Sequence, residues 1–404
     1  MYMGKENKMH IAFISIGALG HVLAALPVCR ELQQRGHRIS FFSAEFIRPQ
    51  AEPFGVDFYA VDSSITKGGK GDENASENVE AELPLRFLKE AEAGVGSIVK
   101  VLENDRPDLI LNDTLALSGR LAAAYLNVPR IQFFTSVAAN EHFHPAMFWP
   151  KELEETEPRK QALALAKELQ NKYGGKLLTS EEIFGGYGDF NIVTIDKKFQ
   201  PAAESFGDNF FFAGPQIAER TGEASWNAPG KDRRKIYVSL GTVFNNNPGF
   251  WRIVFDAVKD LNADIICSIG NILKKEELGE IPGNVYLYEF LPQLKVLRLA
   301  DGFISHAGIG SVMEATWFGV PILAVPQMVE QRIVAEKVKE LQIGDAILEP
   351  DELTSERIRK GILDLLENQD YRNRIWLFQN VMHETEGPEF AADAVLEYFE
   401  KIQN

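Results

Sequence analysis

The residues best suited to chemistry lie in one stretch, from His306 to Gln331. An apolar run at 302–305 leads into a glycine-rich turn at 307–310, and a helical pattern follows. A turn that opens a helix exposes unpaired N–H groups at the positive end of the helix dipole, and such groups bind phosphate. A histidine precedes this turn, and Glu330-Gln331 ends the next strand, 320–325. This layout indicates a nucleotide-sugar pocket, and it differs from a Walker A loop, which needs Gly-Lys-Ser/Thr after the turn.

A second candidate site lies in the N-terminal half. His21 follows an apolar strand at 11–16, and Asp113 follows a strand at 108–111. Ligands of open α/β sheets bind outside the carboxyl ends of the strands, so both side chains can share one rim. An imidazole can take a proton from a hydroxyl, and a carboxylate on its other nitrogen fixes the tautomer. The alternative is structural, with His21 in a helix-start turn and Asp113 as a loop cap.

Composition excludes several classes of protein. The 404 residues are 45% hydrophobic, enough for two or three domains, and the net charge of −16 disfavours nucleic-acid and anionic-membrane partners. Cys29 and Cys267 lie in separate apolar runs, which indicates buried thiols rather than a disulfide or a metal site. The sequence has no Asp-x-Asp cluster of the kind that a metal–diphosphate site would need. The polar N-terminus and the absence of long apolar runs predict a soluble cytoplasmic protein.

In the N-terminal half, the predicted strands and helices alternate as in a βαβ protein. Strand 11–16, helix 22–34 and strand 39–42 form one such unit, which implies a parallel sheet. The turn is not Gly-x-Gly-x-x-Gly and no acidic residue closes the second strand, so dinucleotide binding is disfavoured. Further predicted elements are a loop at 63–82, helices 83–102, 117–126 and 158–173, and strands 108–111, 130–134 and 210–215. The long aromatic segment 140–187 interrupts this alternation of strands and helices, and such an insertion is suited to form a specificity pocket.

The C-terminal half repeats the pattern after a polar segment, 216–234, of linker composition. The predicted strands are 235–240, 264–269, 285–290, 302–305 and 320–325, and the predicted helices are 250–261, 294–299, 354–366, 371–382 and 390–402. Two halves of one architecture imply an α/β protein with two Rossmann-like domains that face each other across a cleft. We expect domains at 1–215 and 235–384, with the helical segment 385–404 packing back on the first.

Several motifs resemble a known family. Phe290-Leu-Pro-Gln293, His306-Ala-Gly-Ile-Gly-Ser-Val-Met-Glu314, Gly319-Val-Pro321 and Pro326…Glu330-Gln331 are similar to the donor signature of family 1 UDP-glycosyltransferases. The resemblance extends to Gly20-His21-Val22, Asn112-Asp113 and Ser239-Leu-Gly-Thr242, and hence over essentially the whole chain. It is closest to the bacterial macrolide-glycosyltransferase branch, including Bacillus members that act on flavonoids and other phenols, and it implies the GT-B fold.

The resemblance also implies residue roles. His21 would be the catalytic base and Asp113 its partner. The donor would be bound by Ser239, Gly241, Thr242, Phe290, Gln293, His306, Gly308, Gly310, Ser311, Glu314, Glu330 and Gln331. Within this set, Phe290 replaces the tryptophan that stacks on uracil in many members, Glu314 would bind ribose, and Glu330 and Gln331 would bind the sugar. Many plant relatives carry Asp at position 330 and Asn at position 310.

Some of these residues also have a structural explanation that needs no ligand. Ser311 and Glu314 have the spacing of a capping box, in which they would satisfy helix-start amides without a ligand. His306 would then be a hydrogen-bonded structural histidine, and Phe290 a core aromatic. In the N-terminal half, we expect the acceptor site to be lined by Leu19, Phe134, Phe143 and Phe148.

The resulting hypothesis is an inverting transfer of a hexose, glucose in the first instance, from a UDP-sugar to a hydroxyl of a small hydrophobic acceptor such as a flavonoid, phenol or macrolide. No metal and no cofactor beyond the UDP-sugar substrate are expected, and the chain would be a monomer or weak homodimer. Two alternatives stay open: a GT-B-like UDP-sugar epimerase, and a catalytically silent nucleotide-sugar-binding partner of another enzyme.

Overall fold

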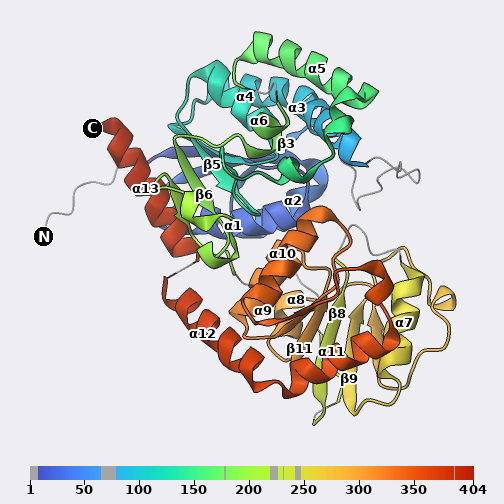
Figure 1. The fold of residues 1–404 in the computed structure, drawn as a ribbon. Helices are drawn as coiled ribbons and strands as arrows, with labels where there is room; N and C mark the ends of the chain where they lie inside the picture. The colour runs from blue at the N-terminus through green and yellow to red at the C-terminus, as the bar shows by residue number, and fades with distance from the viewer. Residues whose placement is uncertain are drawn as a thin grey trace, which may run out of the picture. The chain divides into compact units, whose positions relative to one another are not determined.

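The chain forms two compact units in the computed structural model, each built around one parallel sheet. The structure describes residues 8–64, 79–176, 179–218, 226–230, 232–241, 247–385 and 387–404. One unit comprises Met1–Glu219 and Glu386–Asn404, and the other comprises Arg220–Thr385. Figure 1 shows the helices that flank each sheet. The α/β class with two Rossmann-like parallel-sheet units is therefore confirmed.

The sheet of the first unit has seven strands in the order β3-β2-β1-β4-β5-β6-β7. Their bounds are β1 His10–Ile14, β2 Arg38–Ala44, β3 Asp57–Val61, β4 Leu109–Asp113, β5 Arg130–Phe134, β6 Phe190–Val193 and β7 Phe210–Phe212. All neighbouring strands are parallel. The direction in which successive strands are added reverses between β1 and β4, which makes the carboxyl ends of these two strands the topological switch point.

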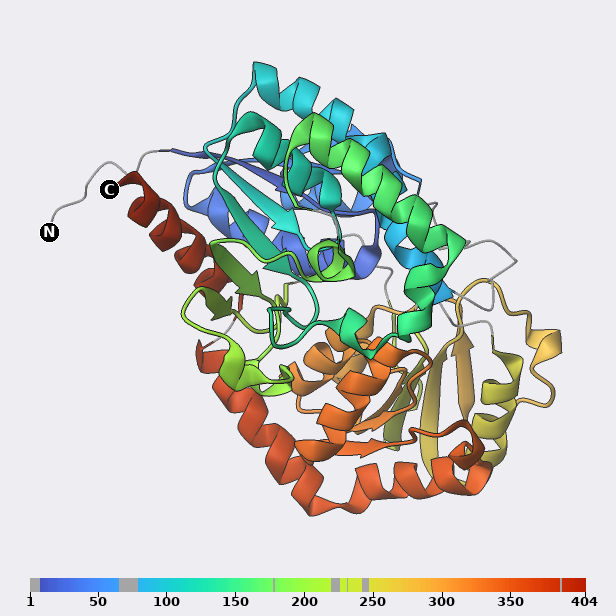
Figure 2. The same ribbon diagram turned by 45° about the horizontal axis from the view of Figure 1, so that its top comes forward.

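Helices cover both faces of this sheet. They are α1 Leu19–Gln34, α2 Arg48–Ala51, α3 Val79–Asn104, α4 Leu117–Leu126, α5 Glu157–Tyr173, α6 Ser180–Gly185 and α13 Pro388–Gln403. Helix α5 packs on α3 and α4 over one face (Figure 2). The C-terminal helix α13 packs against α1 and β6 on the other, where Tyr398 stacks on Phe190 with ring centroids 4.9 Å apart. The last helix of the chain thus belongs to the first unit.

The second unit has six parallel strands in the order β10-β9-β8-β11-β12-β13. The strands are β8 Arg234–Ser239, β9 Ala263–Ser268, β10 Val285–Tyr288, β11 Gly302–Ser305, β12 Ile322–Ala324 and β13 Gly344–Ala346. The helices are α7 Pro248–Val258, α8 Gln293–Leu297, α9 Ile309–Trp317, α10 Val329–Glu340, α11 Ser355–Glu367 and α12 Gln369–Thr385. The switch point here lies between β8 and β11.

Three strands and a twelve-residue helix are among the elements that were not expected from the sequence. Strand β3 is an edge strand with half-buried residues, β6 follows the aromatic segment, and β13 has only three residues, so none gives a strong apolar run. Helix α10 buries Gln331, Val334, Ala335 and Val338, a weakly apolar stripe. Glu330 and Gln331 therefore lie in the first turn of a helix and not at the end of a strand, which corrects their expected placement.

Other observations concern the whole described chain. Cys29 and Cys267 are buried free thiols, as expected. No helix of the described part is long and apolar enough to cross a membrane. Among the same residues, no three His, Cys, Asp or Glu side chains are grouped so that they could hold a metal ion.

Candidate active site

The structure brings His21 and Asp113 together at the switch point of the first unit. Asp113 is the last residue of β4, and His21 lies in the first turn of α1, which begins at Leu19 after the end of β1. The N-cap of that helix is Ala18, so His21 is not a capping residue. His21 Nδ1 lies 2.8 Å from Asp113 Oδ1. A carboxylate only accepts hydrogen bonds, so Nδ1 carries the proton and Nε2 keeps the lone pair of a base.

Several hydrogen-bond donors surround the Asp113 carboxylate. Its side chain is fully buried. Oδ2 accepts hydrogen bonds from Ser15 Oγ at 3.1 Å and from the Ile16 N–H at 3.2 Å, and Oδ1 also accepts from the Leu115 N–H at 3.2 Å. Donors aimed at both oxygens compensate the lost hydration of a buried carboxylate. The arrangement can therefore orient an imidazole and stabilise an imidazolium.

Sequence reasoning missed two contributors to this site. Thr135 Oγ1 lies 2.8 Å from His21 Nδ1, and Ser15 contacts Asp113. Both residues directly follow a strand, β5 and β1 respectively, on the same edge of the sheet. That position was the available signal, because residues just past parallel strand ends gather at one rim.

A buried arginine links the aromatic segment 140–187 to the edge of the sheet where β4 ends. Arg120 of α4 donates to the backbone carbonyls of Glu182 and Ile183 in α6, and to that of Thr114 at 3.3 Å. Burial, with the charge of Arg130 as a second cause, lowers the pKa of Arg120 to about 9. The guanidinium thereby anchors α6 to the residue that follows Asp113.

The four residues expected to line an acceptor site divide into two pairs. Leu19 is 38% exposed and Phe148 is 53% exposed, so both present apolar surface. Phe134 is buried and packs on Phe210, which assigns it to the core and corrects its expected role. Phe143 is also buried, and it packs against Phe148 with ring centroids 6.2 Å apart.

In the second unit, two serines shape the turns at the switch point. Ser239 ends β8, and its Oγ accepts a hydrogen bond from the Gly241 N–H at 3.2 Å. Ser305 ends β11, and its Oγ accepts one from the Ala307 N–H at 3.1 Å. Ala307 has φ +61°, a left-handed conformation that costs a non-glycine residue about 1 kcal/mol or more. Strain of this kind clusters at ligand sites.

The His306 imidazole is wedged between two glycines. A Cβ at Gly241 would lie 2.7 Å from His306 Nε2, and one at Gly308 would lie 2.4 Å from it. Burial lowers the pKa of His306 to about 4, so the ring is neutral near pH 7. Its buried Nδ1 has no hydrogen-bond partner in the described part of the chain. The glycines thus make room for a neutral imidazole beside the turn into α9.

Helix α9 begins beside this ring without a side-chain cap. Its N-cap is Gly308, and Ser311 is its third residue, so the capping box that Ser311 and Glu314 would form is absent. Gly310 is exposed, and a Cβ there would have no heavy atom within 4 Å. The backbone N–H groups at the start of this nine-residue helix can donate hydrogen bonds to an anion.

Ser311 and Glu314 instead join Gln293, the first residue of α8. Gln293 Nε2 donates to Glu314 Oε2 at 2.6 Å and to Ser311 Oγ at 3.2 Å. Glu314 is largely buried, at 9% exposed. A carboxylate held at this depth can accept further hydrogen bonds from hydroxyl groups.

The remaining predicted donor residues differ in how exposed they are. Phe290 follows β10 and is 62% exposed, so it is not a core aromatic. Gln331 is buried, and its Oε1 accepts a hydrogen bond from the Gln327 N–H at 2.8 Å. Glu330 is exposed in the same helical turn. Thr242 lies outside the described residues.

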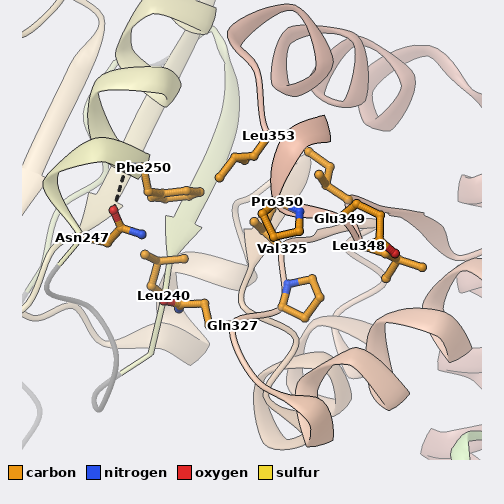
Figure 3. Close-up of a pocket in the computed structure, with 11 residues that line it drawn as sticks. Leu240, Asn247, Phe250, Val325, Gln327, Leu348, Glu349, Pro350 and Leu353 are labelled. Atoms are coloured by element: carbon orange, nitrogen blue, oxygen red, sulfur yellow. Dashed lines mark hydrogen bonds between the residues drawn. The ribbon is translucent and has the colours of Figure 1, made fainter. Parts of the chain in front are cut away.

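A separate cavity of about 330 Å³ lies at the carboxyl ends of β8, β12 and β13 (Figure 3). Apolar residues such as Phe250 and Leu353 form most of its wall. Two of its polar residues are already engaged, since Asn247 caps α7 through the Phe250 N–H and Glu349 pairs with Arg332 at 2.7 Å. The predicted donor residues are not among its lining, so sequence reasoning did not identify this cavity.

Comparisons with known proteins identify the family. Residues 252–395 match the model of the erythromycin biosynthesis protein CIII-like C-terminal domain. The chain is 33% identical over 398 residues to NDP-glycosyltransferase YjiC of Bacillus subtilis (strain 168), covering 98% of each chain. It is 30% identical over 406 residues to demethyllactenocin mycarosyltransferase of Streptomyces fradiae, covering 97% of this chain and 87% of that protein.

Its fold is similar to the crystal structure of CalG4, the calicheamicin glycosyltransferase, with a TM-score of 0.81 and 29% identity over 98% of this chain and 100% of that one. The whole-length matches agree with the two parallel-sheet units and with the donor signature described above. The chain therefore belongs to the family 1 glycosyltransferases of the GT-B fold, in the macrolide-glycosyltransferase-like branch that includes Bacillus enzymes.

Proposed function

We propose that this glycosyltransferase moves a hexose, glucose in the first instance, from a UDP-sugar to a hydroxyl of a small hydrophobic acceptor such as a flavonoid, phenol or macrolide. The observation that carries the proposal is the hydrogen-bonded pair of His21 and Asp113 in a chain that also holds the Gln293–Glu314 cluster. Relatives named for demethyllactenocin and calicheamicin support natural-product acceptors. The exposed apolar side chains of Leu19 and Phe148 suit such a molecule.

The first unit would supply the base. His21 Nε2 takes the proton of the acceptor hydroxyl as its oxygen attacks the anomeric carbon from the face opposite the nucleotide. The new glycosidic C–O bond forms while the bond from the anomeric carbon to the phosphate oxygen breaks, so the configuration inverts. Asp113 stabilises the resulting imidazolium. General-base assistance of this kind contributes about 10²–10⁴-fold to the rate.

The second unit would hold the donor. The UDP that leaves takes the electron pair of the broken bond, and its growing negative charge lies where the open amides of α9, His306 and Ser311 can stabilise it. Glu314, oriented by Gln293, would accept hydrogen bonds from the ribose hydroxyls. Glu330 and Gln331 would bind the sugar. UDP is the proposed nucleotide because this buried carboxylate suits a diol.

The test is a mass-spectrometric screen of UDP- and dTDP-sugars against phenols and macrolides. We expect β-linked glucosides from UDP-glucose, a loss of about 10²–10⁴ in turnover for His21→Ala with UDP affinity retained, and weakened UDP binding for His306→Ala. The matched control is His142→Ala, because His142 is a solvent-exposed histidine. Conversion of the UDP-sugar without an acceptor would indicate an epimerase. UDP-sugar binding without any product would indicate a silent partner.

A further inference from the structure

The amide of Gln293 has partners at both ends. Its Nε2 donates to Glu314 Oε2 at 2.6 Å and to Ser311 Oγ at 3.2 Å, and its Oε1 accepts a hydrogen bond from the Tyr237 hydroxyl at 3.2 Å. Because a carboxylate cannot donate, a flipped amide would place two acceptors, Oε1 and the carboxylate of Glu314, against each other. The Tyr237 hydroxyl would then face an NH₂ group instead of a carbonyl. Tyr237 and Glu314 thus favour the same orientation of the amide.

Tyr237 is itself fixed in place. It is 2% exposed on β8, directly opposite Phe303 of β11, and the two rings stack with centroids 4.7 Å apart and planes 10° from parallel. Burial raises the pKa of the Tyr237 phenol, so the hydroxyl stays protonated and able to donate. A buried tyrosine hydroxyl normally finds an acceptor, and this one finds the Gln293 carbonyl.

We propose that Tyr237 is a positioning residue that, through Gln293, orients the Glu314 carboxylate for the ribose diol, and so makes the site select ribonucleoside diphosphates over 2′-deoxyribonucleoside diphosphates. This inference rests on the proposed donor role of Glu314. A 2′-deoxy nucleotide lacks one of the two hydroxyl donors and so forms one hydrogen bond fewer to the buried carboxylate, which weakens its binding. The preference depends on the carboxylate being held where both ribose hydroxyls can reach it. The hydrogen bonds from Tyr237 to Gln293 and from Gln293 to Glu314 hold it there.

The experiment measures dissociation constants of UDP and 2′-deoxy-UDP by calorimetry for the wild-type chain, Tyr237→Phe, Gln293→Leu and the double variant. Tyr237→Phe keeps the ring stack and removes only the hydroxyl. We expect the wild type to prefer UDP by about 10–100-fold, and Tyr237→Phe to reduce this preference about three- to tenfold by weakening UDP alone. Because Tyr237 acts through Gln293, the double variant should match Gln293→Leu.

Controls separate positioning from packing. Tyr286→Phe, on edge strand β10 of the same sheet, should leave both dissociation constants unchanged. If Tyr237→Phe weakens UDP and 2′-deoxy-UDP equally, leaves both unchanged, or adds independently to Gln293→Leu, the positioning role is overturned. The proposed function fails differently: a wild-type chain that yields no glycoside refutes it whatever the nucleotide preference, whereas glycoside formation with an unaltered preference in Tyr237→Phe refutes only this inference.

Discussion

The neutral His306 makes a quantitative prediction about stability and pH. Its ring is enclosed by Gly241 and Gly308, and burial lowers its pKa from 6.5 to about 4. The folded chain therefore binds this proton less readily than the unfolded chain does. Stability is unaffected above pH 6.5 and falls as the pH drops from 6.5 towards 4, because only the unfolded state gains the proton in that window.

The size of the effect follows from the two pKa values. They differ by about 2.5, and each pKa unit corresponds to about 1.36 kcal/mol, so the full loss is about 3 kcal/mol below pH 4. At pH 5.5 the loss relative to pH 8 is about 1 kcal/mol from this residue alone. That pH is practical because the excess of acidic side chains keeps the chain negatively charged there.

The assay compares wild type with His306→Gln, which cannot titrate, by denaturant unfolding at pH 8 and pH 5.5. The wild type should lose about 1 kcal/mol more than the variant between the two pH values, whatever the variant's absolute stability. His142→Gln, which removes a surface imidazole, is the matched control. An equal pH dependence in wild type and His306→Gln would show that the ring is not neutralised by burial, and would refute the reasoning.

Three further predictions concern the candidate sites of the two units. Gly310→Ala should stabilise the chain by about 0.5–1 kcal/mol, since the position is helical with open space around it, and should weaken UDP binding if the amides of α9 hold the diphosphate; thermal unfolding and calorimetry measure the two effects. Gly241→Ala should destabilise by about 1 kcal/mol or more, because φ is +78° and the new Cβ meets His306; a higher melting temperature would contradict this. Asp113→Asn should lower kcat about 10²–10⁴-fold while UDP binding persists, because the amide cannot fix His21 as its carboxylate does; steady-state kinetics with unchanged kcat would exclude the role.

The sequence by itself determined the architecture and the family. Apolar runs, glycine-rich turns and helical spacing predicted the two parallel-sheet units, because these patterns are local and are repeated in both halves. Helix 117–126 and strand 130–134 were placed at their observed bounds. The His306 turn and the helix after it were also read from local pattern, since a turn that opens a helix is encoded by adjacent residues.

Only the tertiary structure decided which distant residues meet. The contact of His21 with Thr135 joins residues 114 positions apart, and the bond from Tyr237 to Gln293 spans 56. Such pairs depend on strand order and register, which periodicity does not specify. Burial likewise separated Phe134, a core residue, from Phe148, an exposed one, although both are phenylalanines in aromatic segments. The capping box is absent because α9 begins about one turn earlier than the Ser311–Glu314 spacing suggests. The Glu314 carboxylate therefore does not cap the helix and instead accepts a hydrogen bond from Gln293.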